Sequence, residues 1–218
     1  MKFDRRDFLI TAGAGLGTAW LGANWSAALA ASAHSRAAVA SATPPKFEFF
    51  TPEQATEVAA ICARIIPSDD SPGATEVGAV YFIDRGLITI SPEAQPIYRD
   101  GLPQFQEKFH AMFPGAGRFS AASAEQQDQF LRAEDNVGKP VGRRQRASSD
   151  APTFFETVRV HTIAAFLIDP ESDYAGNRSG VGWQVVGRES AHTFQPPFGF
   201  YDKDYPGWSP SPAAAKAK

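Results

Sequence analysis

The feature that most constrains the fold is a helix, predicted over residues 152–168, that is apolar on nearly every face. A helix of that kind has to be surrounded by other elements, so we expect the rest of the chain to pack around it. Arg159 and His161 are the exceptions along this helix. A buried histidine is more often a hydrogen-bonded core residue than a ligand or a catalytic group, and we favour that interpretation for His161.

An aromatic, proline-rich segment follows this helix. Eleven aromatic residues lie between Phe154 and Trp208, and such a concentration has to be buried in the chain's own core or against a partner. A short helix is predicted near residues 183–188, and an extended strip follows, in which two prolines favour polyproline II. We expect this strip to dock on a partner; alternatively it packs back on the apolar helix. The candidate docking residues are Phe194, Pro196, Pro197, Phe198, Phe200, Tyr201 and Tyr205.

Composition excludes several classes of protein. The 218 residues allow one domain with tails, and a hydrophobic fraction of 43% is enough for a core. The net charge of −3 gives no basic footprint, so nucleic acid is not an expected partner. Cys62 is the single cysteine, which excludes an internal disulfide, a four-cysteine iron–sulfur site and a Cys-x-x-Cys-His haem attachment. It falls on the apolar face of a predicted helix, where we expect a buried, unreactive thiol.

The N-terminus has the pattern of an export signal. A basic start is followed by an uncharged segment that many glycines and alanines make only weakly hydrophobic. The paired arginines resemble the twin-arginine (Tat) signal, which would place the chain in the periplasm. An uncleaved membrane anchor is disfavoured because the apolar run is short and rich in glycine. The signal residues are Arg5, Arg6, Phe8 and Leu9, and the small-x-small cleavage sites are Ala28-Leu29-Ala30, Ala31-Ser32-Ala33 and Ala38-Val39-Ala40.

Two capping boxes predict where helices begin. Thr51-Pro52-Glu53-Gln54 places an N-cap threonine, a first-turn proline and a glutamine at the third position, and opens a helix to about Ile65. Ser123-Ala124-Glu125-Gln126 opens another helix, to about Glu134. Between them, spacing predicts a helix over residues 76–87.

A further helical region begins at Ser91-Pro92. Pro96 and Pro103 are expected to break it into a short piece and a main piece over residues 102–112. His110 lies off the apolar stripe and is expected to be exposed. That stripe is formed by Phe105, Phe109, Met112 and Phe113.

Together these patterns predict a mainly α protein. We expect a compact, irregular bundle of about five helices with a long, extended, aromatic and proline-rich C-terminal segment. The expected organisation is a twin-arginine signal peptide over residues 1–30, an Ala/Ser/Pro linker over 31–46, a helical domain over 47–206 and a disordered tail over 207–218.

No catalytic, cofactor-binding or metal-binding residues are assigned. The sequence has no Gly-x-Gly-x-x-Gly after a strand, no His-Glu-x-x-His, no Walker loop and no Gly-x-Ser-x-Gly. Asp69 and Asp70 could contribute to a cation site, but calcium needs six or more oxygen ligands, so a turn or a helix cap is favoured. The arginine-rich loop over residues 138–150 is expected to be solvated.

Several short motifs, in order, resemble gluconate 2-dehydrogenase subunit 3, the small or gamma subunit of membrane-bound FAD-dependent sugar dehydrogenases. Ala175 departs from the second glycine expected before Gly176, which affects the local turn. The motif residues singled out are Arg159, His161, Asn177 and Trp183. The motifs are Ile65-Ile66-Pro67 with 69–74, Ala79-Val80-Tyr81-Phe82-Ile83-Asp84, Phe154-Phe155 with Arg159, His161 and Thr162, Tyr174-x-Gly176-Asn177, Gly182-Trp183, and residues 196–202.

The resemblance implies a non-catalytic subunit. Such subunits accompany a large GMC-type flavoprotein that holds FAD and oxidises the sugar, and in many of these enzymes a multi-haem cytochrome c passes electrons to the membrane. The small subunit would carry the signal for the Tat translocase, export its partner as a hitchhiker and associate with the membrane through the complex. The rival interpretations are an autonomous periplasmic enzyme that uses His161, Asp69 and Asp70, and a stand-alone binding or chaperone-like module.

Overall fold

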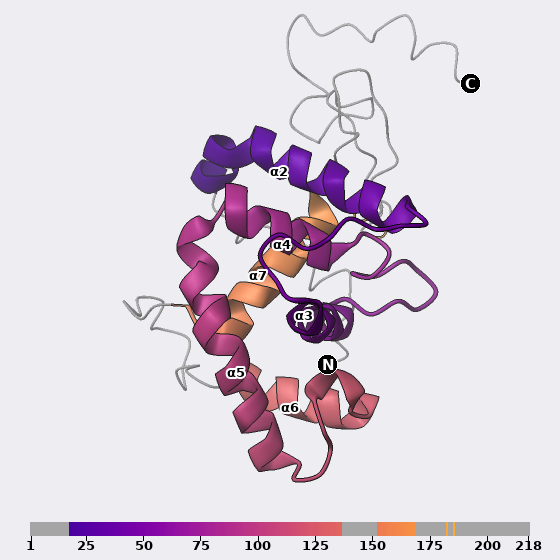
Figure 1. Cartoon of the computed structure of the whole chain (residues 1–218), viewed down its shortest axis with the longest axis vertical. Helices are drawn as coiled ribbons and strands as arrows, with labels where there is room; N and C mark the ends of the chain where they lie inside the picture. Colours follow the sequence, from indigo (N-terminus) through magenta and orange to yellow (C-terminus); the bar gives the residue numbers. More distant parts are fainter. Residues whose placement is uncertain (1–17, 137–151, 169–181, 183–184, 186–218) are drawn as a thin grey trace, which may run out of the picture.

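The computed structural model describes residues 18–136, 152–168, 182 and 185 (Figure 1). These residues form helices and contain no strand, so the predicted mainly α fold is confirmed. None of the described helices is long and apolar enough to cross a membrane. The elements are α2 (Thr18–Ala40), α3 (Pro52–Ile65), α4 (Ala79–Thr89), the 3-10 helix η1 (Pro92–Ala94), α5 (Gln95–Met112), the 3-10 helix η2 (Phe119–Ala121), α6 (Ala124–Asn136) and α7 (Phe154–Leu167).

Helix α7 is the central element, as its apolar sequence predicts. It contacts α3, α4, α5 and α6, and Figure 1 shows it crossing between them. Its first turn is closed by a capping box: the Glu156 amide donates to the Thr153 hydroxyl (3.2 Å) and the Thr153 amide donates to the Glu156 carboxylate (3.0 Å). Nine of its side chains are buried, which explains why polar residues are rare along it.

Both predicted capping boxes are present. The Gln54 amide donates to the Thr51 hydroxyl over 3.3 Å, and the Thr51 amide donates back to Gln54 Oε1 over 3.0 Å. Ser123 and Gln126 form the same pair of bonds at the start of α6. Each box satisfies amide groups that have no partner inside the helix, which fixes where the two helices begin.

The prediction that prolines divide α5 is wrong. The helix is continuous from Gln95 to Met112 with Pro103 inside it, while Pro96 lies in the first turn, where an N–H has no helical partner. The missing hydrogen bond at Pro103 is offset by the packing of Leu102 and other large side chains on the core face. His110 is exposed as predicted, but Met112 is 41% exposed and lies outside the core stripe expected to contain it.

Helix α4 begins three residues later than its spacing predicts, and the turn before it explains why. Gly78, directly before the helix, has φ 67° and ψ 41°, a left-handed conformation that a helix cannot contain. The Glu76 carboxylate accepts hydrogen bonds from the Gly73 amide and from the Ser68 hydroxyl, at 2.6 Å each. Residues 74–78 therefore form a closed turn in place of the first helical turn.

Helix α2 differs most from expectation. Residues 31–40 of the expected linker are helical, and α2 lies across α4 at one end of the molecule (Figure 1). Ala28 and Ala31 are fully buried, and Ser32 and Ser35 are nearly so. Small side chains permit close contact between two helices, and that contact gives this alanine- and serine-rich segment its ordered place in the fold.

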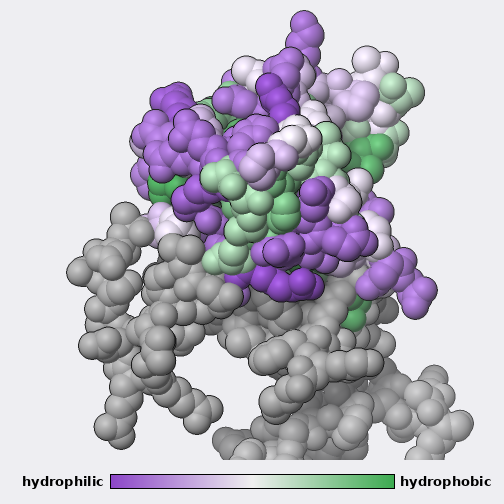
Figure 2. Space-filling view, turned by 90° about the horizontal axis from the view of Figure 1, so that it is seen from below, coloured by the Kyte–Doolittle hydropathy of each residue, from purple (hydrophilic) through white to green (hydrophobic). Residues whose placement is uncertain are grey.

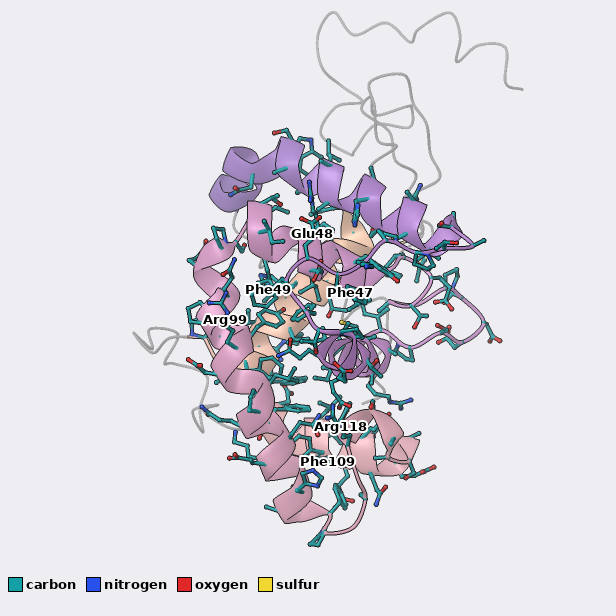
Figure 3. The ribbon with its side chains drawn as sticks, viewed as in Figure 1. Phe47, Glu48, Phe49, Arg99, Phe109 and Arg118 are labelled. Carbon is teal, nitrogen blue, oxygen red and sulfur yellow. The ribbon has the colours of Figure 1, made fainter. Side chains whose placement is uncertain are left out.

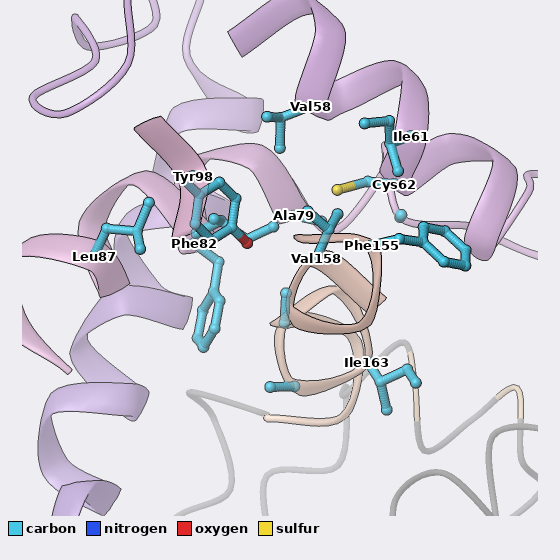
Figure 4. Packing of buried hydrophobic residues seen from close by; sticks show 14 of the residues in the cluster. Val58, Ile61, Cys62, Ala79, Phe82, Leu87, Tyr98, Phe155, Val158 and Ile163 are labelled. Carbon is cyan, nitrogen blue, oxygen red and sulfur yellow. The ribbon is translucent and has the colours of Figure 1, made fainter. Parts of the chain in front are cut away.

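The core is largely aromatic at one end and aliphatic at the other. Four phenylalanine rings, whose centroids lie 4.9–6.3 Å apart, join α5, η2 and α6. Toward α4, Figure 4 shows Val58 and Ile61 of α3 facing Val158 of α7, with the Cys62 sulfur between the two helices. The four rings belong to Phe105, Phe109, Phe119 and Phe130.

Candidate functional site

The motif residue Arg159 lies in a groove between the end of α3, α6 and α7. This groove, which we name the arginine groove, has a volume of about 370 Å³. The Arg159 guanidinium lies 2.5 Å from Asp135 of α6 and 5.9 Å from the centroid of the Phe155 ring. The lining residues are Arg64, Ile65, Pro67, Asp128, Leu131, Arg132, Asp135, Phe155 and Arg159.

Charges in the arginine groove are arranged in pairs across helices. Arg64 of α3 donates to Asp128 of α6, with N···O distances of 2.6 and 2.8 Å. These side chains are partly exposed, so each ion pair contributes about 1 kcal/mol or less to stability. The groove has no histidine or cysteine in its lining. Paired charges and the apolar wall at Phe155 give the groove the character of a polar contact surface.

The second motif residue, His161, faces the opposite way and is held by Tyr98. The Tyr98 hydroxyl lies 3.0 Å from Nδ1 of His161, and the two rings are stacked with centroids 5.8 Å apart. Burial lowers the pKa of His161 to about 4 and raises the pKa of Tyr98 well above its ordinary value. At neutral pH the imidazole is therefore uncharged, and it shares this hydrogen bond with the Tyr98 hydroxyl. This is the hydrogen-bonded core histidine that the sequence favours.

A small cavity adjoins His161, between α7 and α4. Its volume is about 10 Å³, which is about enough for one water molecule and far too small for a sugar. Neither Asp69 nor Asp70 lines it. Asp69 instead accepts hydrogen bonds from the Ser71 amide and hydroxyl, at 2.9 Å each, which is the geometry of a local turn. The lining residues are Phe82, Ile83, Gly86, Ile90, Ser91 and His161.

Cys62 is buried, as predicted. The Thr162 hydroxyl donates to its sulfur over 3.2 Å. Desolvation raises the pKa of the Cys62 thiol to about 12, so it is a thiol and not a thiolate at neutral pH. Across residues 18–136 and 152–168, no three His, Cys, Asp or Glu side chains are placed to hold a metal ion.

Two buried carboxylates have contacts that sequence reasoning did not predict, although Asp84 was part of a family motif. Asp84 accepts hydrogen bonds from three successive amides, those of residues 48–50, at 2.8–3.0 Å. Figure 3 shows this segment, with Phe49 beside Arg99, whose guanidinium lies 5.4 Å from the ring centroid. Glu57 of α3 binds Gln106 of α5 and both the amide and the hydroxyl of Ser120. The sequence signal for both was an acidic residue at a helix position where the periodicity places apolar, buried residues.

The face of the molecule seen from below is largely hydrophilic. Figure 2, which views the molecule from below, shows hydrophilic side chains around a narrow apolar strip. The large hydrophobic residues that are more than a third exposed are Trp25, Val39, Ile88, Met112 and Val160.

Several predicted residues lie outside the described part of the chain. These are the motif residues Asn177 and Trp183, the export signal Arg5, Arg6, Phe8 and Leu9, and the docking residues Phe194, Pro196, Pro197, Phe198, Phe200, Tyr201 and Tyr205.

Of the motif Gly182-Trp183, the structure describes Gly182. A Cβ atom on Gly182 would lie 1.9 Å from the Phe166 carbonyl oxygen, so the position requires glycine. Val185, one turn later, packs against the core, and both residues are helical. The chain beyond α7 therefore returns to contact the end of that helix.

The comparisons with known proteins identify the family. A family model for gluconate 2-dehydrogenase subunit 3 matches residues 52–189, well over half of the chain. Comparison with curated proteins and with solved structures gives no match. The matched residues include α3 to α7, and α2 precedes them. They also include the contact of Arg159 with α6 and the contact of His161 with α5. The chain belongs to the gluconate 2-dehydrogenase subunit 3 family.

Proposed function

We propose that this chain is the non-catalytic small subunit of a periplasmic FAD-dependent sugar or sugar-acid dehydrogenase. Its partner is a large GMC-type flavoprotein that binds FAD and carries out the oxidation. A multi-haem cytochrome c is a possible third subunit, and the complex as a whole associates with the membrane. The observation that carries the proposal is the family match over residues 52–189, the described part of which forms one continuous helical core.

The contacts of the family-motif residues support a structural role for this chain. His161 is uncharged and bound to Tyr98, and Arg159 is paired with Asp135. A general base has to reach the proton that it removes, whereas His161 adjoins a cavity of about 10 Å³. Both residues therefore fix the position of α7 against its neighbours. The autonomous enzyme that would use His161, Asp69 and Asp70 draws no support from this arrangement.

The proposed route of export depends on the arginine pair at residues 5 and 6. The twin-arginine pathway carries folded proteins, so a flavoprotein without a signal of its own crosses while bound to this chain. The low hydrophobicity of the segment after the arginines supports this route. Assembly then takes place before export, in the compartment where FAD is inserted.

The experiment compares the chain alone with the chain produced together with a flavoprotein encoded beside it. We expect the purified chain alone to show no flavin absorbance and no dye reduction with gluconate. Co-production should give a complex with one flavin per pair of subunits, and omission of this chain should leave the flavoprotein in the cytoplasm. Stoichiometric flavin on the isolated chain would contradict the division of roles. A flavoprotein exported equally well without this chain would contradict the carrier role.

A further inference from the structure

The three candidate cleavage sites of the export signal all lie within α2. These are Ala28-Leu29-Ala30, Ala31-Ser32-Ala33 and Ala38-Val39-Ala40, and α2 extends from Thr18 to Ala40. One alanine of each site is buried: Ala28 and Ala31 have no exposed surface, and Ala38 is 1% exposed. The segment that sequence patterning assigns to processing is therefore part of the helical core.

A buried hydrogen bond attaches the middle site to the end of α7. The Ser32 hydroxyl donates to the Ile168 carbonyl oxygen over 2.7 Å, and the Ser35 hydroxyl donates to the Ser32 carbonyl oxygen over 2.8 Å. The last carbonyls of a helix lack partners within it, so Ser32 satisfies a group that would otherwise be buried without one. Removing residues up to 33 or 40 would leave this carbonyl without its partner.

Gly78 brings α2 into backbone contact with the start of α4. A Cβ atom on Gly78 would lie 2.8 Å from the Ser35 carbonyl oxygen and 2.7 Å from a methyl group of Val39. Glycine is thus required there for space as well as for its φ of 67°. Helix α2 lies too close to α4 for a protease to enter between them, and Figure 1 shows α2 running along that face.

We infer that docking of α2 on α4 and α7 protects the three alanine sites from signal peptidase, and that residues 24–40 remain in the exported protein as a structural helix. The inference rests on the proposed export by the twin-arginine route, because a chain that crosses folded presents these sites already docked. Proteases cut segments that are exposed and can adopt an extended conformation. Cleavage at these sites would therefore require α2 to dissociate from α4 and α7 and to unwind.

A direct test uses purified signal peptidase in detergent micelles and does not depend on export. The substrates are the full-length chain and a synthetic peptide of residues 1–46, which carries the same export signal and the same three sites without the surface on which α2 docks. We expect the peptide to be cut and the full-length chain to be cut at least about tenfold more slowly. Equal rates would overturn the inference. A peptide that is not cut would also overturn it, because docking would then have nothing to protect.

A matched pair of variants separates docking from backbone strain. Gly78→Asn introduces a side chain that tolerates the left-handed region but collides with Ser35 and Val39. Gly117→Asn carries a comparable backbone cost, with φ 69°, and meets no atom within 4 Å. Cleavage of the full-length chain should accelerate in Gly78→Asn and stay unchanged in Gly117→Asn. If Gly78→Asn does not fold, as shown by circular dichroism, Ser32→Ala replaces it. No acceleration in a folded docking variant would count against the inference.

The intact mass of the exported complex gives the test in cells. Retention of residues 24–40 is the expected result, and an N-terminus at residue 31, 34 or 41 would overturn the inference. A chain that stays in the cytoplasm would contradict the proposed export, while the peptidase assay would still decide whether docking protects the sites. The two proposals can therefore fail separately.

Discussion

The Tyr98 hydroxyl lies 3.0 Å from Nδ1 of His161, and burial keeps the imidazole of this pair uncharged. The pair joins α5 to α7 through two stacked rings. Protonation of His161 would place a positive charge inside the core, and the loss of hydration on burial disfavours that charged form.

Stability should therefore fall as the pH drops through the range where unfolded histidine takes up a proton. The pKa of His161 is about 4 in the folded protein and 6.5 by ordinary standards, so the unfolded state binds more protons between these values. The free energy of unfolding is expected to be constant above about pH 6.5 and to fall by about 2 kcal/mol by about pH 5 from this residue.

Urea unfolding of the wild type and of His161→Gln at about pH 6.5 and about pH 5 checks this prediction. Glutamine can still accept from Tyr98 but does not titrate. The variant's loss of unfolding free energy between the two pH values should therefore be about 2 kcal/mol smaller than that of the wild type. His110→Gln is the control, because His110 is exposed. The same pH difference in wild type and His161→Gln would show that His161 does not cause the acid sensitivity.

Asp84→Asn should destabilise the domain by about 2–4 kcal/mol. The carboxylate is 3% exposed and accepts from three amides. An asparagine would keep the oxygen that accepts from two of them and would turn its NH₂ group toward the Glu48 amide, which would lose its acceptor. The loss should appear in the melting temperature and in urea titrations. Asp100→Asn is the matched control, because Asp100 lies on the exposed side of α5. If Asp84→Asn lost no more unfolding free energy than the control, water would be replacing the hydrogen bonds between Asp84 and the three amides.

Replacing Arg5 and Arg6 together with lysine should keep both this chain and its flavoprotein partner in the cytoplasm. The charge is unchanged, so the variant tests recognition of the arginine pair and not basicity. Fractionation followed by dehydrogenase assays on each compartment provides the measurement. Lys2→Arg serves as the control, since it alters a basic residue outside the pair. Normal periplasmic activity of the double variant would rule out the twin-arginine route.

Phe198→Ala with Tyr201→Ala should weaken binding of the flavoprotein by about 2 kcal/mol or more while leaving the helical circular dichroism nearly intact. The sequence predicts an extended, proline-stiffened strip here, and aromatic anchors on such a strip would suit docking. Melting temperature and partner affinity should be measured on the same preparation. A lower melting temperature of the isolated subunit, with affinity falling only as far as the folded fraction, would instead place the strip on the subunit's own core.

Local chemistry in the sequence determines where α3 and α6 begin, and these two starts were predictable. Thr51 with Gln54 and Ser123 with Gln126 form bonds between residues three apart, so no knowledge of the tertiary fold is needed. The apolar helix over residues 152–168 was equally clear, because apolar residues on every face require burial from all sides. The burial of Cys62 and the hydrogen-bonded state of His161 followed from the same patterns.

Features that depend on distant residues could not be read in advance. Pro103 is accommodated because the core face of α5 holds the helix together, and spacing alone does not reveal that support. Alanine and serine differ little in hydrophobicity, so residues 31–40 show no helical periodicity and resemble a linker in the sequence. The helix is revealed only by its packing on α4. The partners of Asp84 are amides more than thirty positions away, which a local pattern cannot identify.

The bond from Ser32 to Ile168 joins positions 136 residues apart in the sequence. A ribosome synthesises Ser32 early and Ile168 late, so the surface on which α2 rests is incomplete until α7 has emerged. Throughout most of translation α2 can therefore contact α4 but lacks the end of α7. The bond from Ser32 to Ile168 forms late, and it marks a chain whose helical core is complete.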